Sequence, residues 1–326
     1  MTQTYRSDTK SRLGILLKGS ISAALIAWLI SQVDLATFSA RLTTAHQDWV
    51  GAAAALLLLQ VVIAAQRWQW VLRALRISLG LREALRIVFV GLFFNQTLPT
   101  TVGGDIVRVL ELRRANITIG RATTSVVLDR LSALLAVLLI VALSLPLLLA
   151  LINETAPKIS LLVASLGGLL GLVGLAHLDL LVAVLPRWKL PTHVQLLLRN
   201  GRRVLFGAHY SAHILGSSLL VTIISGISVG LIARSLDIEV DILTCVVLVP
   251  PVLLISTLPV SLAGWGVREA AMVVAMSYAH VGTADALLLS IAFGCIVMAM
   301  GLPGGILWLL RSYNATRPPI APAKAH

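Results

Sequence analysis

The chain has 326 residues, of which 58% are hydrophobic and only 12% are charged, and its formal net charge is +12. A soluble globular domain carries about 25% charged residues, so this composition excludes a soluble protein and predicts an all-α polytopic membrane protein. Most lysines and arginines lie in short segments between hydrophobic runs. The positive-inside rule expects this placement, so we attribute the positive charge to membrane topology and expect no nucleic-acid partner.

Hydrophobic runs that predict helices occur near residues 13–33, 49–66, 84–98, 131–151, 160–184, 212–233, 242–258, 270–282 and 286–310. Several of them reach the ~20 apolar residues that cross a bilayer. The first run follows Arg6, Lys10 and Arg12 and has no small-residue cleavage site. We therefore interpret it as a retained helix and not as a signal peptide.

The run 84–98 lies between two basic segments, 67–86 and 108–121, and the positive-inside rule places both in the cytoplasm. One crossing cannot leave both of its ends on the same side. We therefore expect a re-entrant hairpin that turns near Pro99 and Gly104, where proline and glycine break a helix. Irregular backbone at membrane depth has to be buried in protein or line a polar cavity, so the break indicates a site.

The second half of the chain repeats this polar stretch. TLPVSLAGWGVR (257–268) aligns without a gap with TLPTTVGGDIVR (97–108), 160 positions earlier, and its Pro259 matches Pro99. The loop that precedes it is the most acidic in the chain and is expected outside the cytoplasm. The second hairpin would then enter the membrane from the opposite side.

We accordingly predict two inverted repeats, residues 10–152 and 157–312, each with three spanning helices and one re-entrant or broken helical hairpin. The repeats form a single transmembrane domain, 1–317, with both termini in the cytoplasm and a disordered tail at 318–326. An ordinary bundle of eight or nine helices is the alternative. No P-loop, zinc-protease or nucleophile-elbow motif occurs, so we expect no enzymatic activity, no metal and no cofactor.

Arg108 and Arg268 end the two repeated stretches. An arginine at the bilayer centre costs about 2.5–3.5 kcal/mol, so each is expected to face a partner or water. A guanidinium binds phosphate bidentately, and we interpret the pair as phosphate clamps for a lipid headgroup. The alternative is that each arginine anchors its helix at the membrane interface.

Carboxylates stand close to both arginines. Asp105 lies three residues before Arg108, and Glu269 directly follows Arg268. Either carboxylate could orient its arginine or carry a proton, and a structural ion pair is the simpler interpretation. Asn95 could line the groove or satisfy the broken backbone.

Asp129 and Arg130 are expected to open the helix that begins at residue 131. We interpret them as a pair at the membrane interface that could also face the first hairpin.

Three segments together resemble one family, the lysylphosphatidylglycerol synthase transmembrane-region family of flippase-like integral membrane proteins. The pattern Asn-x-x-Leu-Pro-x-x-x-Gly-Gly-Asp-x-x-Arg is matched by Asn95, Leu98, Pro99, Gly103, Gly104, Asp105 and Arg108. An Asp-Arg pair is matched by Asp129 and Arg130, and Gly-x-Gly-x-Arg-Glu is matched by Gly264, Gly266, Arg268 and Glu269. The resemblance covers residues 10 to 312.

The resemblance implies a multi-pass protein of the bacterial inner membrane that translocates or handles an anionic phospholipid or a polyprenyl-phosphate-linked lipid. The matched residues, together with Pro259, would form its substrate-binding set. We expect a stand-alone member without the soluble aminoacyl-transferase domain of two-domain members, with an anionic membrane lipid as partner and a possible cytoplasmic or membrane enzyme partner. The alternatives are a non-catalytic subunit of an aminoacyl- or glycosyl-lipid synthase system and a lipid-binding membrane organiser.

Overall fold

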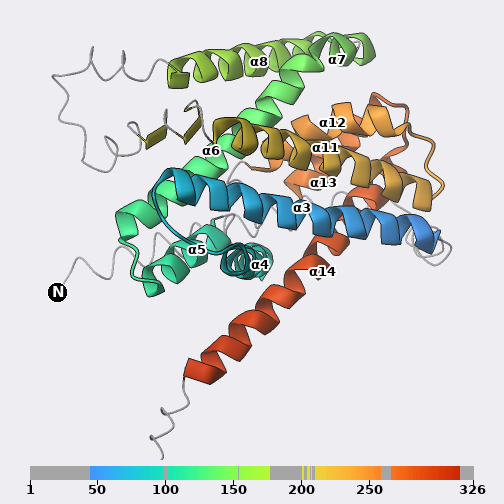
Figure 1. Ribbon diagram of the computed structural model, residues 1–326. Helices are drawn as coiled ribbons and strands as arrows, with labels where there is room; N and C mark the ends of the chain where they lie inside the picture. Colours follow the sequence, from blue (N-terminus) through green and yellow to red (C-terminus); the bar gives the residue numbers. More distant parts are fainter. Residues whose placement is uncertain are drawn as a thin grey trace, which may run out of the picture.

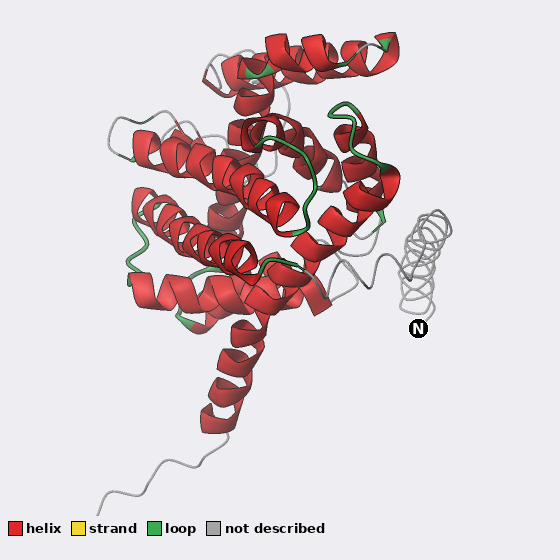
Figure 2. Cartoon of the chain, turned by 90° about the vertical axis from the view of Figure 1, so that its right-hand side faces the viewer, coloured by secondary structure: helices red, strands yellow, loops and turns green. Residues whose placement is uncertain are grey.

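The computed structural model describes residues 45–97, 102–152, 154–176, 210–257 and 266–315, with residues 200–201, 204–205 and 207. Within these ranges the chain folds into helices joined by short loops (Figure 2). The predicted first helix at 13–33, the tail at 318–326 and the residues Pro99, Pro259 and Gly264 lie outside the described part.

The described helices are α3 (Gln47–Ala74), α4 (Leu81–Thr97), α5 (Gly103–Arg114), α6 (Ile119–Leu143), α7 (Leu145–Leu151), α8 (Thr155–Ala176), α11 (Ser211–Ser235), α12 (Ile242–Ser256), α13 (Val267–Ser277) and α14 (Thr283–Ala315). Four of them, α3, α6, α11 and α14, are long and apolar enough to cross a membrane. The chain is therefore an all-helical, multi-pass membrane protein.

The helices occur twice in the same order. A long helix, a helix of intermediate length, a short helix and another long helix follow one another as α3 to α6 and again as α11 to α14. Each helix of the second set begins 161 to 164 residues after its counterpart in the first. This offset agrees with the 160 positions between the repeated polar stretches. The order of the helices is therefore repeated together with the polar stretch.

The two sets are packed into each other. Helices α3 and α11 lie side by side through the middle of the molecule (Figure 1). Helix α4 packs against α14, and α12 packs against α6. Each intermediate helix thus contacts the last long helix of the other set, and the fold has an approximate internal symmetry.

The contact between α4 and α14 depends on glycine. A Cβ atom on Gly304 would lie 1.9 Å from the carbonyl oxygen of Phe89, and one on Gly305 would lie 2.8 Å from the Phe93 ring. Small residues allow helix backbones to approach closely in membrane proteins. The small size of Gly304 and Gly305 therefore determines how closely α4 packs against α14.

Helices α4 and α5 form an antiparallel hairpin. At its open end Arg86 Nη2 donates a hydrogen bond to Glu111 Oε2 (2.9 Å). Near the turn the backbone N–H of Gly104 donates to Asn95 Oδ1 (2.8 Å). The start of α4 and the end of α5 therefore lie at the same end of the hairpin.

Several predicted boundaries were wrong. Helix α3 continues to Ala74, beyond the run that ends at residue 66, because Trp68 and Leu72 are buried in the core. The helix expected at residue 131 begins at Ile119, so Asp129 and Arg130 lie in its interior. Its early turns contain too many polar residues to be detected as a hydrophobic run.

The single predicted run 131–151 is divided into α6 and α7 at Ser144. Pro146 stands in the first turn of α7, a position that proline tolerates, but it cannot continue the hydrogen-bonding pattern of α6. Helix α8 packs against α6 and α7 at the edge of the molecule (Figure 1).

Candidate functional site

Arg108 is buried where α5 meets α3, α4 and α6. Its position depends on Gly91 of α4, because a Cβ atom there would lie 3.2 Å from Arg108 Cγ. Gly104 is packed even more tightly, since a Cβ atom on it would lie 2.0 Å from the Gly91 carbonyl oxygen. Asn95 accepts a hydrogen bond from Gly104 N and thereby satisfies one of the free N–H groups of the first turn of α5. The helix break thus brings a buried arginine close to α4.

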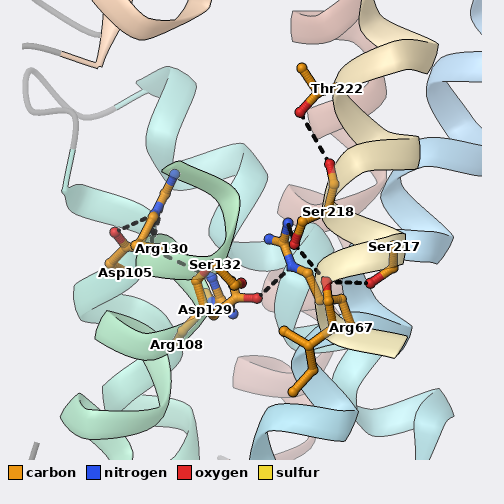
Figure 3. Close-up of polar contacts among 10 residues, drawn as sticks. Arg67, Asp105, Arg108, Asp129, Arg130, Ser132, Ser217, Ser218 and Thr222 are labelled. Atoms are coloured by element: carbon orange, nitrogen blue, oxygen red, sulfur yellow. Dashed lines mark hydrogen bonds and ion pairs between the residues drawn. The ribbon is translucent and has the colours of Figure 1, made fainter. Parts of the chain in front are cut away.

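Asp129 lies at the centre of the site (Figure 3). Its Oδ2 accepts a hydrogen bond from Arg108 Nη2 (2.7 Å), and its Oδ1 accepts one from Arg67 Nε (2.8 Å). Arg67 Nη1 also donates to Ser218 Oγ (3.3 Å). The relative exposures of Asp129, Arg67 and Arg108 are 3%, 6% and 8%. One carboxylate therefore connects α3, α5 and α6, and Arg67 extends the network to α11.

Arg130 and Asp105 form a second, more exposed pair beside the first. The Arg130 guanidinium donates three hydrogen bonds, 2.9–3.2 Å long, to the two carboxylate oxygens of Asp105 (Figure 3). Half of the Arg130 side chain is exposed. Asp105 also lies 3.6 Å from Arg108 Nη1. The predicted pair between Asp105 and Arg108 is thus present, but Arg130 is the closer partner of Asp105.

A cavity of about 250 Å³ opens next to these charges. Its polar lining comes from Gln60, Arg67, Asn95, Arg108, Asp129 and Arg130, and the remaining lining residues are apolar or glycine. Three arginines and one aspartate give the lining a positive formal charge. The cavity is therefore suited to an anion.

Two buried N–H groups near the cavity have no hydrogen-bond partner among the described residues, Arg108 Nε and Trp68 Nε1. They belong to stacked side chains, because the Arg108 guanidinium carbon lies 4.2 Å from the centre of the Trp68 ring. A buried donor without a partner costs about 1–3 kcal/mol. Arg108 lines the cavity, so an anion bound there would meet a guanidinium that its protein partners do not fully satisfy.

The second repeated stretch has a different arrangement. Arg268 Nε and Nη2 both donate to Oε1 of the neighbouring Glu269. Glu269 Oε2 accepts a hydrogen bond from Gly266 N (2.6 Å), and Ser290 Oγ donates to Oε1 (3.4 Å). Glu269 therefore caps α13 and neutralises Arg268 locally, which is the structural ion pair that we gave as the simpler interpretation.

Arg268 and Glu269 do not line the cavity that contains Arg108. Arg268 packs instead against α14, where a Cβ atom on Gly294 would lie 2.2 Å from Arg268 Nη2. The structure thus brings Asn95, Gly104, Asp105, Arg108, Asp129 and Arg130 together around one site. The second-half residues Gly266, Arg268 and Glu269 form a separate cluster.

Sequence reasoning missed Arg67, Trp68, Gln60 and Ser218. Arg67 was assigned to a cytoplasmic loop, but it lies inside α3 and is buried. Gln60 and Arg67 are seven residues apart and so share a helix face, which is the signal that could have identified them. Ser218 carries no comparable signal, because it is 151 positions from Arg67 in the sequence.

Among the residues that the structure describes, no group of three His, Cys, Asp or Glu side chains could hold a metal ion. None of the curated proteins matches the sequence. The family model described as the lysylphosphatidylglycerol synthase TM region matches residues 15–305. This match covers most of the chain and includes both repeated stretches and the Asp129–Arg130 pair, so the chain belongs to the lysylphosphatidylglycerol synthase TM-region family.

Proposed function

We propose that the protein is a lipid translocator that moves an anionic phospholipid or a polyprenyl-phosphate-linked lipid across the inner membrane. The observation that carries this proposal is Arg108. It is buried among apolar helices, lines a positively charged cavity and has a free Nε–H. A guanidinium that lines the cavity can bind a phosphate oxygen through a charge-assisted hydrogen bond.

The placement of the hairpins in the membrane is part of the proposal. Neither α4, with 17 residues, nor α12, with 15, meets the length of a membrane span, and the first hairpin returns to the end from which it starts. The duplicated helix order supports an inverted repeat, in which the hairpins enter from opposite sides. Transporters of this architecture bind substrates near the membrane midplane at broken helices.

The lipid would place its phosphate in the cavity while its acyl chains remain in the bilayer. Because Asp129 holds Arg67 of α3 and Arg108 of α5 together, a phosphate that binds Arg108 competes for the same guanidinium. Binding would loosen the contact between the first hairpin and the helices around it. This coupling would give the headgroup a way to move the hairpin relative to α3 and α6.

Transport in reconstituted vesicles tests the proposal. Purified protein is placed in phosphatidylcholine vesicles with a trace of acyl-labelled phosphatidylglycerol, and dithionite is added to reduce the label in the outer leaflet. The wild-type protein is expected to make the inner-leaflet label accessible as well. Vesicles without protein supply the background.

Three variants sharpen the test. Arg108→Ala is expected to abolish transport, and Arg108→Lys is expected to reduce it strongly, because lysine keeps the charge beside Asp129 but has no Nε–H. Arg113→Ala is the matched control, since Arg113 is an exposed arginine on the same helix, and it should transport like the wild type. Undiminished transport by Arg108→Ala, or tightly bound anionic lipid without transport by the wild type, would contradict the proposal. The latter result would favour a membrane organiser or a synthase subunit.

A further inference from the structure

Five charged side chains form a connected set around the cavity. Arg67, Arg108 and Arg130 are positive, and Asp105 and Asp129 are negative. The formal charge of the set is +1. Four of the five, all except Asp105, line the cavity, and no further charged side chain of the described residues does so.

The two carboxylates neutralise different arginines. Asp129 is shared by Arg67 and Arg108 in the interior, whereas Asp105 holds Arg130 at the exposed side with three hydrogen bonds. Without Asp105, Arg130 would lose its carboxylate partner and present more positive charge to the cavity, whereas Arg108 would keep Asp129. Asp105 does not itself line the cavity, so its charge can change without removing a contact to the headgroup.

We infer that Asp105 sets the charge class of the lipid headgroup, so that the site selects a phosphodiester with one negative charge. The inference rests on the proposed function and names its substrate class. A monoanion brings the charged set from +1 to zero. A phosphomonoester or a diphosphate leaves it negative, and a net charge in a poorly solvated cavity is unfavourable.

The size of the cavity restricts the headgroup further. Sites for drug-sized ligands have volumes of roughly 300–1,000 Å³, and this cavity, at about 250 Å³, is smaller. It fits a phosphate with a small substituent such as glycerol better than one with an oligosaccharide. The expected ligand is thus a phospholipid with a compact, singly charged headgroup.

A series of variants separates charge from structure. Asp105→Asn raises the charge of the set to +2, and Arg130→Gln lowers it to zero. The double variant Asp105→Asn/Arg130→Gln returns the charge to +1, although it has lost the ion pair. If the ion pair were only structural, the double variant would lose the lipid preference of the wild type, as the single variants do. If the charge of the set decides, the double variant regains that preference.

The measurement compares three acyl-labelled lipids in phosphatidylcholine vesicles at pH 8. These are phosphatidylglycerol, a monoanion, phosphatidic acid, and phosphatidylcholine, which is zwitterionic. Phosphatidic acid is close to a dianion at this pH because the second pKa of a phosphomonoester is about 6. A tenfold preference corresponds to about 1.4 kcal/mol, and a unit charge close to the phosphate is worth more than this at an intermediate dielectric constant. The wild type is therefore expected to prefer phosphatidylglycerol over phosphatidic acid by about tenfold or more.

Asp105→Asn should shift the preference toward phosphatidic acid by about the same factor, and Arg130→Gln should shift it toward phosphatidylcholine. Equal transport of all three lipids by the wild type, or a double variant that fails to regain its preference, would overturn the inference. In this experiment the proposed function itself fails if the wild type moves neither of the anionic lipids. If Asp105→Asn does not fold, the lipid preference of Arg130→Gln still decides the result.

Discussion

The two repeated stretches end in the same residue type but hold it differently. Arg108 finds its buried carboxylate on another helix, at Asp129 of α6, whereas Arg268 binds its chain neighbour Glu269. The first arrangement joins three helices and places the guanidinium-bearing residue in the lining of a cavity. In the second arrangement, Glu269 accepts a hydrogen bond from Gly266 N and so caps the first turn of α13. A duplicated motif can therefore keep its arginine while one copy pairs it with a carboxylate on another helix and the other copy pairs it within the same helix.

The largest loss of stability is expected when Asp129, the carboxylate shared by Arg67 and Arg108, is removed. Asp129→Ala leaves Arg67 buried without its carboxylate and Arg108 with only Asp105, 3.6 Å away, and we expect it to lower the free energy of unfolding by about 3–5 kcal/mol. Unfolding by SDS in mixed micelles, followed by circular dichroism, measures this change. Asp48→Asn, at an exposed position in the first turn of α3, is the control and should change stability by less than about 1 kcal/mol. A loss no larger than that of the control would show that the interhelical pair does not hold the first half together.

A smaller effect is expected where Arg268 meets α14. Gly294→Ala places a methyl group 2.2 Å from the present position of Arg268 Nη2, so the guanidinium has to move, and we expect a loss of about 1–3 kcal/mol. The same unfolding measurement applies. Gly51→Ala is the matched control, because nothing lies within 4 Å of a Cβ atom there, and it should be neutral or stabilising by up to about 1 kcal/mol. Equal behaviour of the two variants would mean that the tight contact is not maintained in the folded protein.

The smallest loss of stability is expected at Glu269, where two variants distinguish the role of the helix cap from the role of the negative charge. Glu269→Gln keeps an oxygen that can accept the Gly266 N–H but loses the charge beside Arg268, and we expect a loss of about 1 kcal/mol. Glu269→Ala loses both and should be clearly less stable than Glu269→Gln. Transport of labelled phosphatidylglycerol, measured in parallel, should be unchanged in Glu269→Gln because Glu269 does not line the cavity. If Glu269→Gln destabilises the protein as much as Asp129→Ala does, the two halves are not as different as their contacts indicate.

Much of the fold follows from periodic and repeated features of the sequence. Apolar runs identify α11, α12 and α14 to within a few residues, because a helix in a membrane has to be apolar along most of its length. The gapless repeat predicts the duplicated helix order, and the break at Gly103–Gly104 predicts the start of α5. The boundaries of α3 and α6 were wrong where polar side chains are buried in pairs, since a pattern of apolar residues cannot detect a helix whose charges neutralise one another.

Local spacing also predicted the contact of Asp105 with Arg108, because residues three positions apart share a helix face. The pair between Arg268 and Glu269 was expected from their adjacency in the sequence. The sequence by itself thus determined the membrane class, the duplication and the identity of the charged residues. Only the tertiary structure decided which charges meet. Arg67 reaches Asp129 across 62 positions and Ser218 across 151, and such contacts depend on how α3, α6 and α11 pack, since a buried charge is stable only where another helix supplies its partner.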